Sequence, residues 1–178
     1  RSPDELDVVY IATTDYAMHT YAPDEPESRR HMAILDDSIG QLVEAQPQTT
    51  LLITADHGMS QKTRMVDLRS QLFRFGIRGD PVPIIKDKYT VHHSNLGGSI
   101  FVYLSDPDDL TEAVKILGEV PGVEEAMPAS EAASRFRLHP ERMGDVYVTG
   151  DPDSVFGDPS QVEMPPRLRS HASLHETR

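Results

Sequence analysis

Residues 50–59 read TLLITADHGM, and this stretch decides the predicted fold. Residues 50–54 form a short apolar run that predicts a buried strand, and Asp56, His57 and Gly58 follow it at once. A carboxylate and an imidazole therefore lie just beyond the carboxyl end of a strand, where open α/β sheets bind ligands. Gly58 permits a sharp turn and close approach to a ligand. The alternative is a simple Asp-His turn in which Gly58 supplies a positive φ.

The segment before this stretch completes a strand-helix-strand unit. Residues 6–13 (LDVVYIAT) predict another buried parallel strand. A helix follows, started by the acidic segment at residues 23–28 and ended by Pro47, with apolar residues at three- and four-residue steps: Met32, Leu35, Ile39, Leu42 and Val43. Two strands joined by a helix predict an α/β fold with a parallel sheet and flanking helices.

The middle of the chain alternates strand and helix without further polar clusters at strand ends. This pattern predicts a small α+β cap or insertion, followed by a long Pro-, Asp- and Gly-rich surface loop at residues 150–169. The expected elements are helix 66–75, loop 76–83, strand 99–104, helix 108–117, strand 123–126, helix 130–136 and strand 145–149. We expect a core at residues 1–80, the cap at 81–150 and a returning loop at 151–178.

Two further groups carry metal-ligand chemistry. Asp15 and His19 follow the first predicted strand, and both residue types are good zinc ligands. The alternative is a helix-capping Asp with a surface His. His171 lies in RSHASLHE after the Pro-rich loop, where the alternative is an unstructured tail.

Composition limits the possible functions. The chain has 178 residues, a net charge of −12 and no cysteine. Any metal must therefore be held by His, Asp or Glu. The acidity argues against a nucleic-acid or anionic-membrane surface, and no apolar run approaches the roughly 20 residues of a membrane span.

The ordered motifs resemble one known family. The segments TTDYAMHTYAP at residues 13–23, TADHGMSQKT at 54–63 and VHHSNLGGSIFVYL at 91–104, with the late RSHASLHE, resemble the type I phosphodiesterase/nucleotide pyrophosphatase family of the alkaline phosphatase superfamily. Within that family the sequences of these segments are most similar to those of the phosphonoacetate hydrolase subgroup. The resemblance implies an alkaline-phosphatase-like α/β core and hydrolysis of small phosphorus esters or phosphonates.

The resemblance also implies a site with two divalent metal ions, expected to be zinc. Asp15, His19 and His171 would hold one ion, and Asp56 and His57 would help to hold the other. The family's Thr or Ser nucleophile has no match in this chain, so we expect it N-terminal to Arg1 and expect the isolated chain to be inactive. Lys86, Lys88, His92 and His93 are candidates to contact a substrate anion, and the alternative for them is solvated surface.

Two other functions remain open at this point. A non-catalytic metal-binding or interaction module would explain the missing nucleophile. A sulfatase or phosphomutase of the same superfamily would keep the fold and change the substrate.

Overall fold

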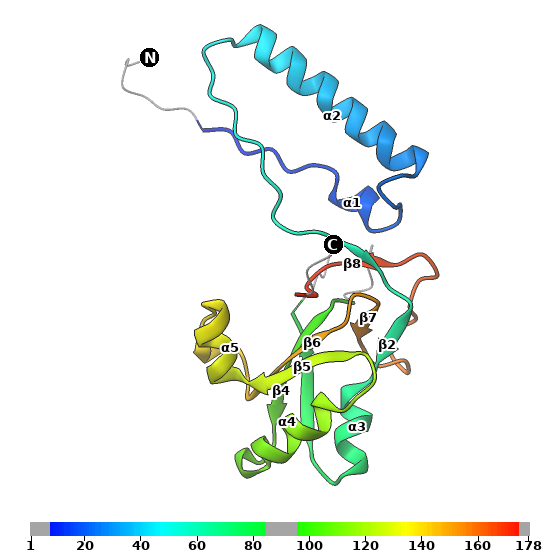
Figure 1. Cartoon of the computed structure of the whole chain (residues 1–178), viewed down its shortest axis with the longest axis vertical. Coiled ribbons are helices and arrows are strands. Elements are labelled where there is room, and N and C mark those ends of the chain that lie inside the picture. Colours follow the sequence, from blue (N-terminus) through cyan, green and yellow to red (C-terminus); the bar gives the residue numbers. More distant parts are fainter. Residues whose placement is uncertain (1–7, 85–95, 175–178) are drawn as a thin grey trace. The chain divides into compact units, whose positions relative to one another are not determined.

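The computed structural model describes residues 8–84 and 96–174, and the chain divides into two compact units, Arg1–Ile53 and Thr54–Arg178 (Figure 1). The first unit holds helices α1 (Asp15–Met18) and α2 (Pro26–Ala45). Pro26 lies at the first helical position, where its missing N–H costs nothing. The buried Ser28 hydroxyl donates to the Tyr21 carbonyl at 3.2 Å and so ties the start of α2 to the turn after α1. The predicted helix that ends before Pro47 is confirmed.

The two strands predicted in this part of the chain are wrong. Residues 8–13 and 50–54 are extended, but within the described ranges neither pairs with another strand. Their apolar side chains lie in solvent, with Val8 80% and Leu52 86% exposed. An apolar β-branched run supplies the side chains of a buried strand but not the neighbours that its N–H and C=O groups require.

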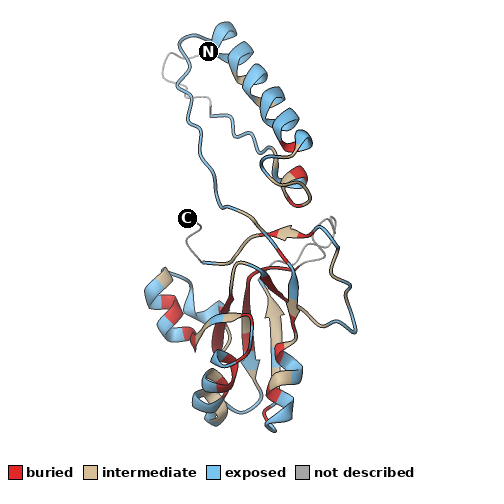
Figure 2. Cartoon of the chain, turned by 45° about the vertical axis from the view of Figure 1, so that its right-hand side comes forward, coloured by how far each residue is buried: buried red, intermediate tan, exposed pale blue. Residues whose placement is uncertain are grey.

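The second unit is built on a four-stranded antiparallel sheet with the order β3-β4-β6-β5. Its strands are β3 (Gly79–Pro83), β4 (Ser99–Leu104), β5 (Val123–Pro128) and β6 (Val146–Gly150). Successive residues of the two central strands face opposite sides of the sheet. In β6, Val146 and Val148 enter one apolar cluster, whereas Tyr147 between them enters another. Both faces are therefore covered, and the central strand β6 is buried along its whole length (Figure 2).

Helices on both faces of the sheet provide these two clusters. Helices α3 (Leu68–Arg74) and α4 (Leu110–Gly118) place Leu72 and Leu117 in the larger cluster. Helix α5 (Ala129–Phe136) places Ala132 in the smaller one. Short 3₁₀ turns, Pro107–Asp109 and Pro140–Arg142, precede α4 and β6. The three helices and the strands at 99–104, 123–126 and 145–149 confirm the prediction for this stretch.

Two regions predicted as loops contain strands. Residues 79–83 form the edge strand β3, which tolerates Pro81 and Pro83 because only one side of an edge strand must donate to a neighbour. Strand β7 (Ser154–Phe156) is fully buried and pairs in parallel with β2 (Arg64–Val66). The remaining pair is antiparallel, β1 (Ser60–Gln61) with β8 (Arg169–Ser170).

The fold class is thus mixed α/β, as predicted, and the described strand pairs include both parallel and antiparallel ones. The parallel pair consists of β2 and β7, both in the second unit. Among the helices of residues 8–84 and 96–174, none combines the length and apolar character that a membrane span requires.

Replacing Leu117 by Ala tests the packing of the sheet. Leu117 is 0% exposed in the larger cluster, so Leu117→Ala should lower the free energy of unfolding by roughly 2–5 kcal/mol. The matched control is Leu138→Ala, at a leucine that is 38% exposed, where surface truncation should cost about 0.5 kcal/mol. Urea unfolding followed by circular dichroism measures both. Equal destabilisation of the two variants would contradict this description of the core.

Candidate functional site

Asp56 and His57 lie at the start of the second unit, just before β1. The Asp56 carboxylate accepts a hydrogen bond from the His57 backbone N–H at 3.0 Å, and its other oxygen lies 3.7 Å from His57 Nε2. That second distance is too long for a hydrogen bond. It is close to the ~3.4 Å that separates two ligand atoms of one tetrahedral zinc ion with bonds near 2.0–2.1 Å. Gly58 does not adopt a positive φ, so the simple turn explanation for this glycine is wrong.

His171 stacks on His57. The two ring centroids are 3.9 Å apart and the ring planes are inclined by 20°. The motif after residue 50 and the motif at the end of the chain therefore meet in one place within the second unit. The alternative of an unstructured tail around His171 is wrong, because residues 169–170 form β8.

The stacking limits how the two rings could bind metal. An imidazole nitrogen binds a metal in the plane of its own ring, at ~2.0–2.1 Å for zinc. For two stacked rings whose centroids are 3.9 Å apart and whose planes are inclined by only 20°, the planes do not meet at such a short range from both rings. His57 and His171 can therefore serve two neighbouring ions but not one shared ion. Metal pairs in two-metal sites are spaced by ~3.5–4 Å, which is similar to the separation of the rings.

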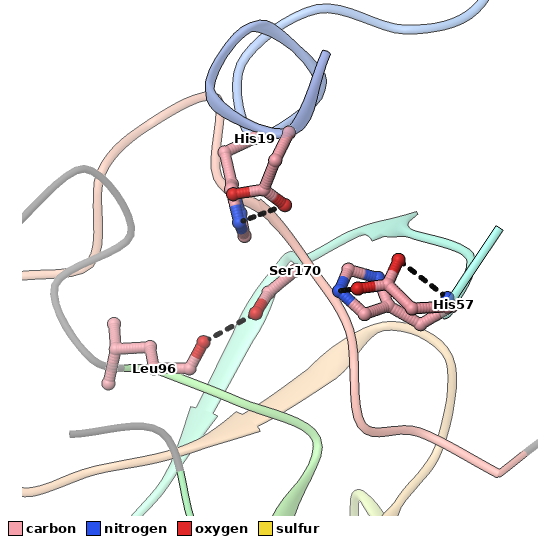
Figure 3. A network of polar contacts seen from close by, with 6 residues as sticks. His19, His57, Leu96 and Ser170 are labelled. Atoms are coloured by element: carbon pink, nitrogen blue, oxygen red, sulfur yellow. Dashed lines mark hydrogen bonds and ion pairs between the residues drawn. The ribbon is translucent and has the colours of Figure 1, made fainter. Parts of the chain in front are cut away.

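The pairing of β1 with β8 brings the two motifs together. Ser60 lies opposite Ser170 and Gln61 opposite Arg169. The Arg169 guanidinium donates to the Met59 carbonyl at 2.9 Å, which adds a side-chain contact at the end of the short ladder. The buried Ser170 hydroxyl donates to the Leu96 carbonyl at 2.6 Å, as Figure 3 shows together with His57.

Asp15 and His19 form a separate pair within the first unit. Asp15 is the first residue of α1 and His19 is its C-cap, with His19 Nε2 3.5 Å from Asp15 Oδ1 (Figure 3). This distance again matches two ligand atoms of one tetrahedral ion, at about 3.4 Å. The alternatives of a helix-capping Asp15 and a surface His19 are both wrong, because Thr14 is the N-cap residue and His19 is 2% exposed. Thr14 also has the left-handed φ of 66°, an uncommon conformation that recurs at functional sites.

The predicted site residues thus fall into two local groups, Asp15 with His19 and Asp56 with His57 and His171. Lys86, Lys88, His92 and His93 lie outside the described residues. In the part of the chain that the structure describes, no three His, Asp or Glu side chains are grouped so as to hold one metal ion. The chemistry of the donors fits divalent zinc, since the two groups supply neutral imidazoles and carboxylates.

Lys62 is a buried residue near these motifs that the sequence analysis did not identify. It is 1% exposed, and its ammonium donates to the Pro152 carbonyl at 2.8 Å. Burial lowers the pKa of Lys62 from 10.5 to about 8, and the carboxylates of Asp151 and Asp153 oppose part of that shift. Its backbone N–H donates to the Leu168 carbonyl at 2.8 Å, three residues before His171. A lysine in a polar motif gives no sequence signal of burial.

Comparison with known proteins shows the family to which the chain belongs. Residues 2–173 match the type I phosphodiesterase/nucleotide pyrophosphatase family, and the chain belongs to that family. The resemblance seen in the sequence motifs is therefore confirmed.

Solved structures agree with this assignment. Phosphonoacetate hydrolase from Sinorhizobium meliloti 1021, in complex with phosphonoacetate, is 28% identical to the chain, with a TM-score of 0.79. The match covers 90% of this chain and 41% of that protein. Murine ectonucleotide pyrophosphatase/phosphodiesterase 5 shares the fold at 19% identity and a TM-score of 0.63, over 89% of this chain and 40% of the murine protein. The chain thus spans about two fifths of the length of these relatives.

The lowered pKa of Lys62 should make stability depend on pH. Between about pH 8 and 10.5 the unfolded chain holds the Lys62 proton more often than the folded chain does. The free energy of unfolding should therefore rise with pH across this window, by up to about 3 kcal/mol. In Lys62→Met this contribution should be absent. The difference in the free energy of unfolding between the wild type and the variant should therefore change between pH 7.5 and pH 10.

Urea unfolding at both pH values measures that difference. An exposed lysine provides the control, because Lys115→Met should give the same difference at pH 7.5 and pH 10. If the difference in the free energy of unfolding for Lys62→Met is also independent of pH, burial does not lower the pKa of Lys62, which would contradict this description.

Proposed function

We propose that this chain is the metal-ligand-bearing part of a hydrolase that acts on small phosphorus esters or phosphonates with two divalent metal ions, preferably zinc. The observation that carries the proposal is the stacking of His57 on His171, with ring centroids 3.9 Å apart, which joins two of the four segments that resemble the family. Membership of the type I phosphodiesterase/nucleotide pyrophosphatase family supports the same reaction class.

The ligands divide between the ions by motif. Asp56 and His57 would help to hold one ion, and Asp15, His19 and His171 would hold the other. The 3.5 Å and 3.7 Å distances within the two Asp-His pairs support this division, because both are near the spacing of ligands on a single tetrahedral ion. The two ring planes support it as well, since His57 and His171 cannot bind the same ion.

Each ligand also has a chemical role of its own. Bound divalent ions stabilise charge on the transferring phosphoryl or phosphonyl group and activate an oxygen nucleophile. The Asp15 and Asp56 carboxylates would neutralise part of the metal charge. The hydrogen bond from the His57 backbone N–H fixes one Asp56 oxygen and leaves the other beside His57 Nε2.

The substrate class is proposed from the relatives. The S. meliloti enzyme was solved with phosphonoacetate and with phosphonoformate, both small anionic phosphonates. For this chain we propose a substrate of similar size, with Lys86, Lys88, His92 and His93 as its anion contacts. The nucleophile is proposed to come from the portion of the enzyme that corresponds to the unmatched length of these relatives.

Zinc binding tests the metal site directly. Zinc per chain, measured by plasma mass spectrometry after dialysis, should fall by about one ion in His171→Ala and by about one in His57→Ala. Each variant should keep the ion that the other loses, because the two rings serve different ions. His139→Ala removes an exposed histidine and should leave the zinc content unchanged. Equal zinc in His171→Ala and His139→Ala would contradict the assignment.

Substrate assays on the longer enzyme would separate the remaining functions. Hydrolysis of a phosphonate or a phosphodiester that depends on zinc and fails in His171→Ala is the expected result. Preferential hydrolysis of a sulfate ester would indicate a sulfatase instead. Zinc binding without turnover of any of the three substrates would favour a non-catalytic module.

A further inference from the structure

The segment around His171 has almost no secondary structure to hold it. Strand β8 has two residues and ends at Ser170, directly before His171. The chain then runs past the start of β4 and the end of β6, the two central strands of the sheet. The position of the His171 ring therefore depends on individual contacts between this segment and the strand ends.

Gly98 makes one of these contacts and allows the two backbones to lie close together. Its backbone N–H donates to the His171 carbonyl at 2.9 Å. A Cβ atom at position 98 would lie 2.7 Å from the Ser173 backbone nitrogen and 3.0 Å from its Cα. Backbone atoms cannot move aside as a flexible side chain can, so only glycine allows the segment to lie this close.

Ser99 holds the next peptide group. Its hydroxyl donates to the Ala172 carbonyl, and the Tyr147 hydroxyl of β6 in turn donates to Ser99 Oγ at 3.2 Å. Ala172 has a φ of 70°, a left-handed conformation that costs an alanine free energy. The Ser99 hydrogen bond to its carbonyl helps to offset that cost and turns the chain sharply after His171.

Ser173 fixes the far side of the turn. Its hydroxyl donates to the Gly150 carbonyl at 2.6 Å, and the Gly150 N–H donates to the Gly98 carbonyl at 2.8 Å. The ends of β4 and β6 and the His171 segment are thus linked to one another. With Ser170 bonded to Leu96, three residues before β4, His171 has hydrogen-bonded contacts on both sides.

We propose that Gly98 and Ser99 are positioning residues that hold the His171 imidazole stacked on His57, and that they thereby set the metal affinity of the site. Neither residue touches a metal or a substrate in this assignment. The effect on metal affinity rests on the proposed function, whereas the effect on ring stacking does not.

Two variants test the proposal in the 178-residue chain. In Gly98→Ala the added methyl group should displace the segment, and in Ser99→Ala the Ala172 carbonyl should lose its partner. The controls are Gly118→Ala, with open space around the added Cβ at the end of α4, and Ser105→Ala, at an exposed serine just after β4. Circular dichroism and urea unfolding establish that each variant is folded.

The spectroscopic readout is the nuclear Overhauser effect between the His57 and His171 ring protons in metal-free protein. The expected result is a clear signal in the wild type and both controls, and a lost or strongly weakened signal in both test variants. Zinc affinity, measured by competition with a chromophoric chelator, should fall about 10–100-fold in the test variants, as for other residues that orient metal ligands.

The outcomes separate this inference from the proposed function. Folded Gly98→Ala and Ser99→Ala proteins that keep the wild-type ring signal overturn the inference. A lost ring signal with unchanged zinc affinity overturns it as well, because position would then not control binding. If Gly98→Ala fails to fold, Ser99→Ala decides alone. If the wild type shows the ring signal but binds no zinc, the proposed function fails while the ring positioning is still judged by the variants.

Discussion

The antiparallel pairing of β1 with β8 is the contact on which the rest of the site depends. It places the segment that follows His57 beside the segment that precedes His171, and the Lys62 N–H extends it by donating to the Leu168 carbonyl. Two paired residues alone form a weak ladder, since isolated two-stranded pairs are marginal in water. The pair is stable here because Leu168 and Ser170 are buried and Ser170 is bonded to Leu96, beside the four-stranded sheet.

Polar groups also help to place this strand pair. Lys62 and Ser60 both donate to the Pro152 carbonyl, so one acceptor in the turn after β6 holds both ends of the β1 region. Burying a lysine has a cost, which appears in the lowered pKa, and the nearby Asp151 and Asp153 compensate for part of it. A buried ammonium must be hydrogen-bonded, so it restricts where its acceptor can lie. The turn and the site motif are therefore fixed relative to each other.

The sequence predicted the elements whose signals are local. Helices α4 and α5 and strands β4 to β6 follow from periodicity and from residues at their ends, and all are confirmed. The errors concern pairing over long distances. Residues 8–13 have the composition of a buried strand but no described partner, whereas β3 contains two prolines and still pairs because it lies at a sheet edge. Composition describes what a strand could do, and the neighbours decide whether it forms.

The same distinction holds at the site. Asp15 with His19, and Asp56 with His57, could be read as pairs because their members are close in sequence. The stacking of His171 on His57 and the contacts of Gly98 and Ser99 join segments far apart in the chain, and no local pattern encodes them. Yet the stacking decides the chemistry that is open to the site. Two nearly parallel rings cannot share one ion in both ring planes, so under the proposed function each ring would serve its own ion, and the contacts that fix the stack would also set the spacing of the two ions.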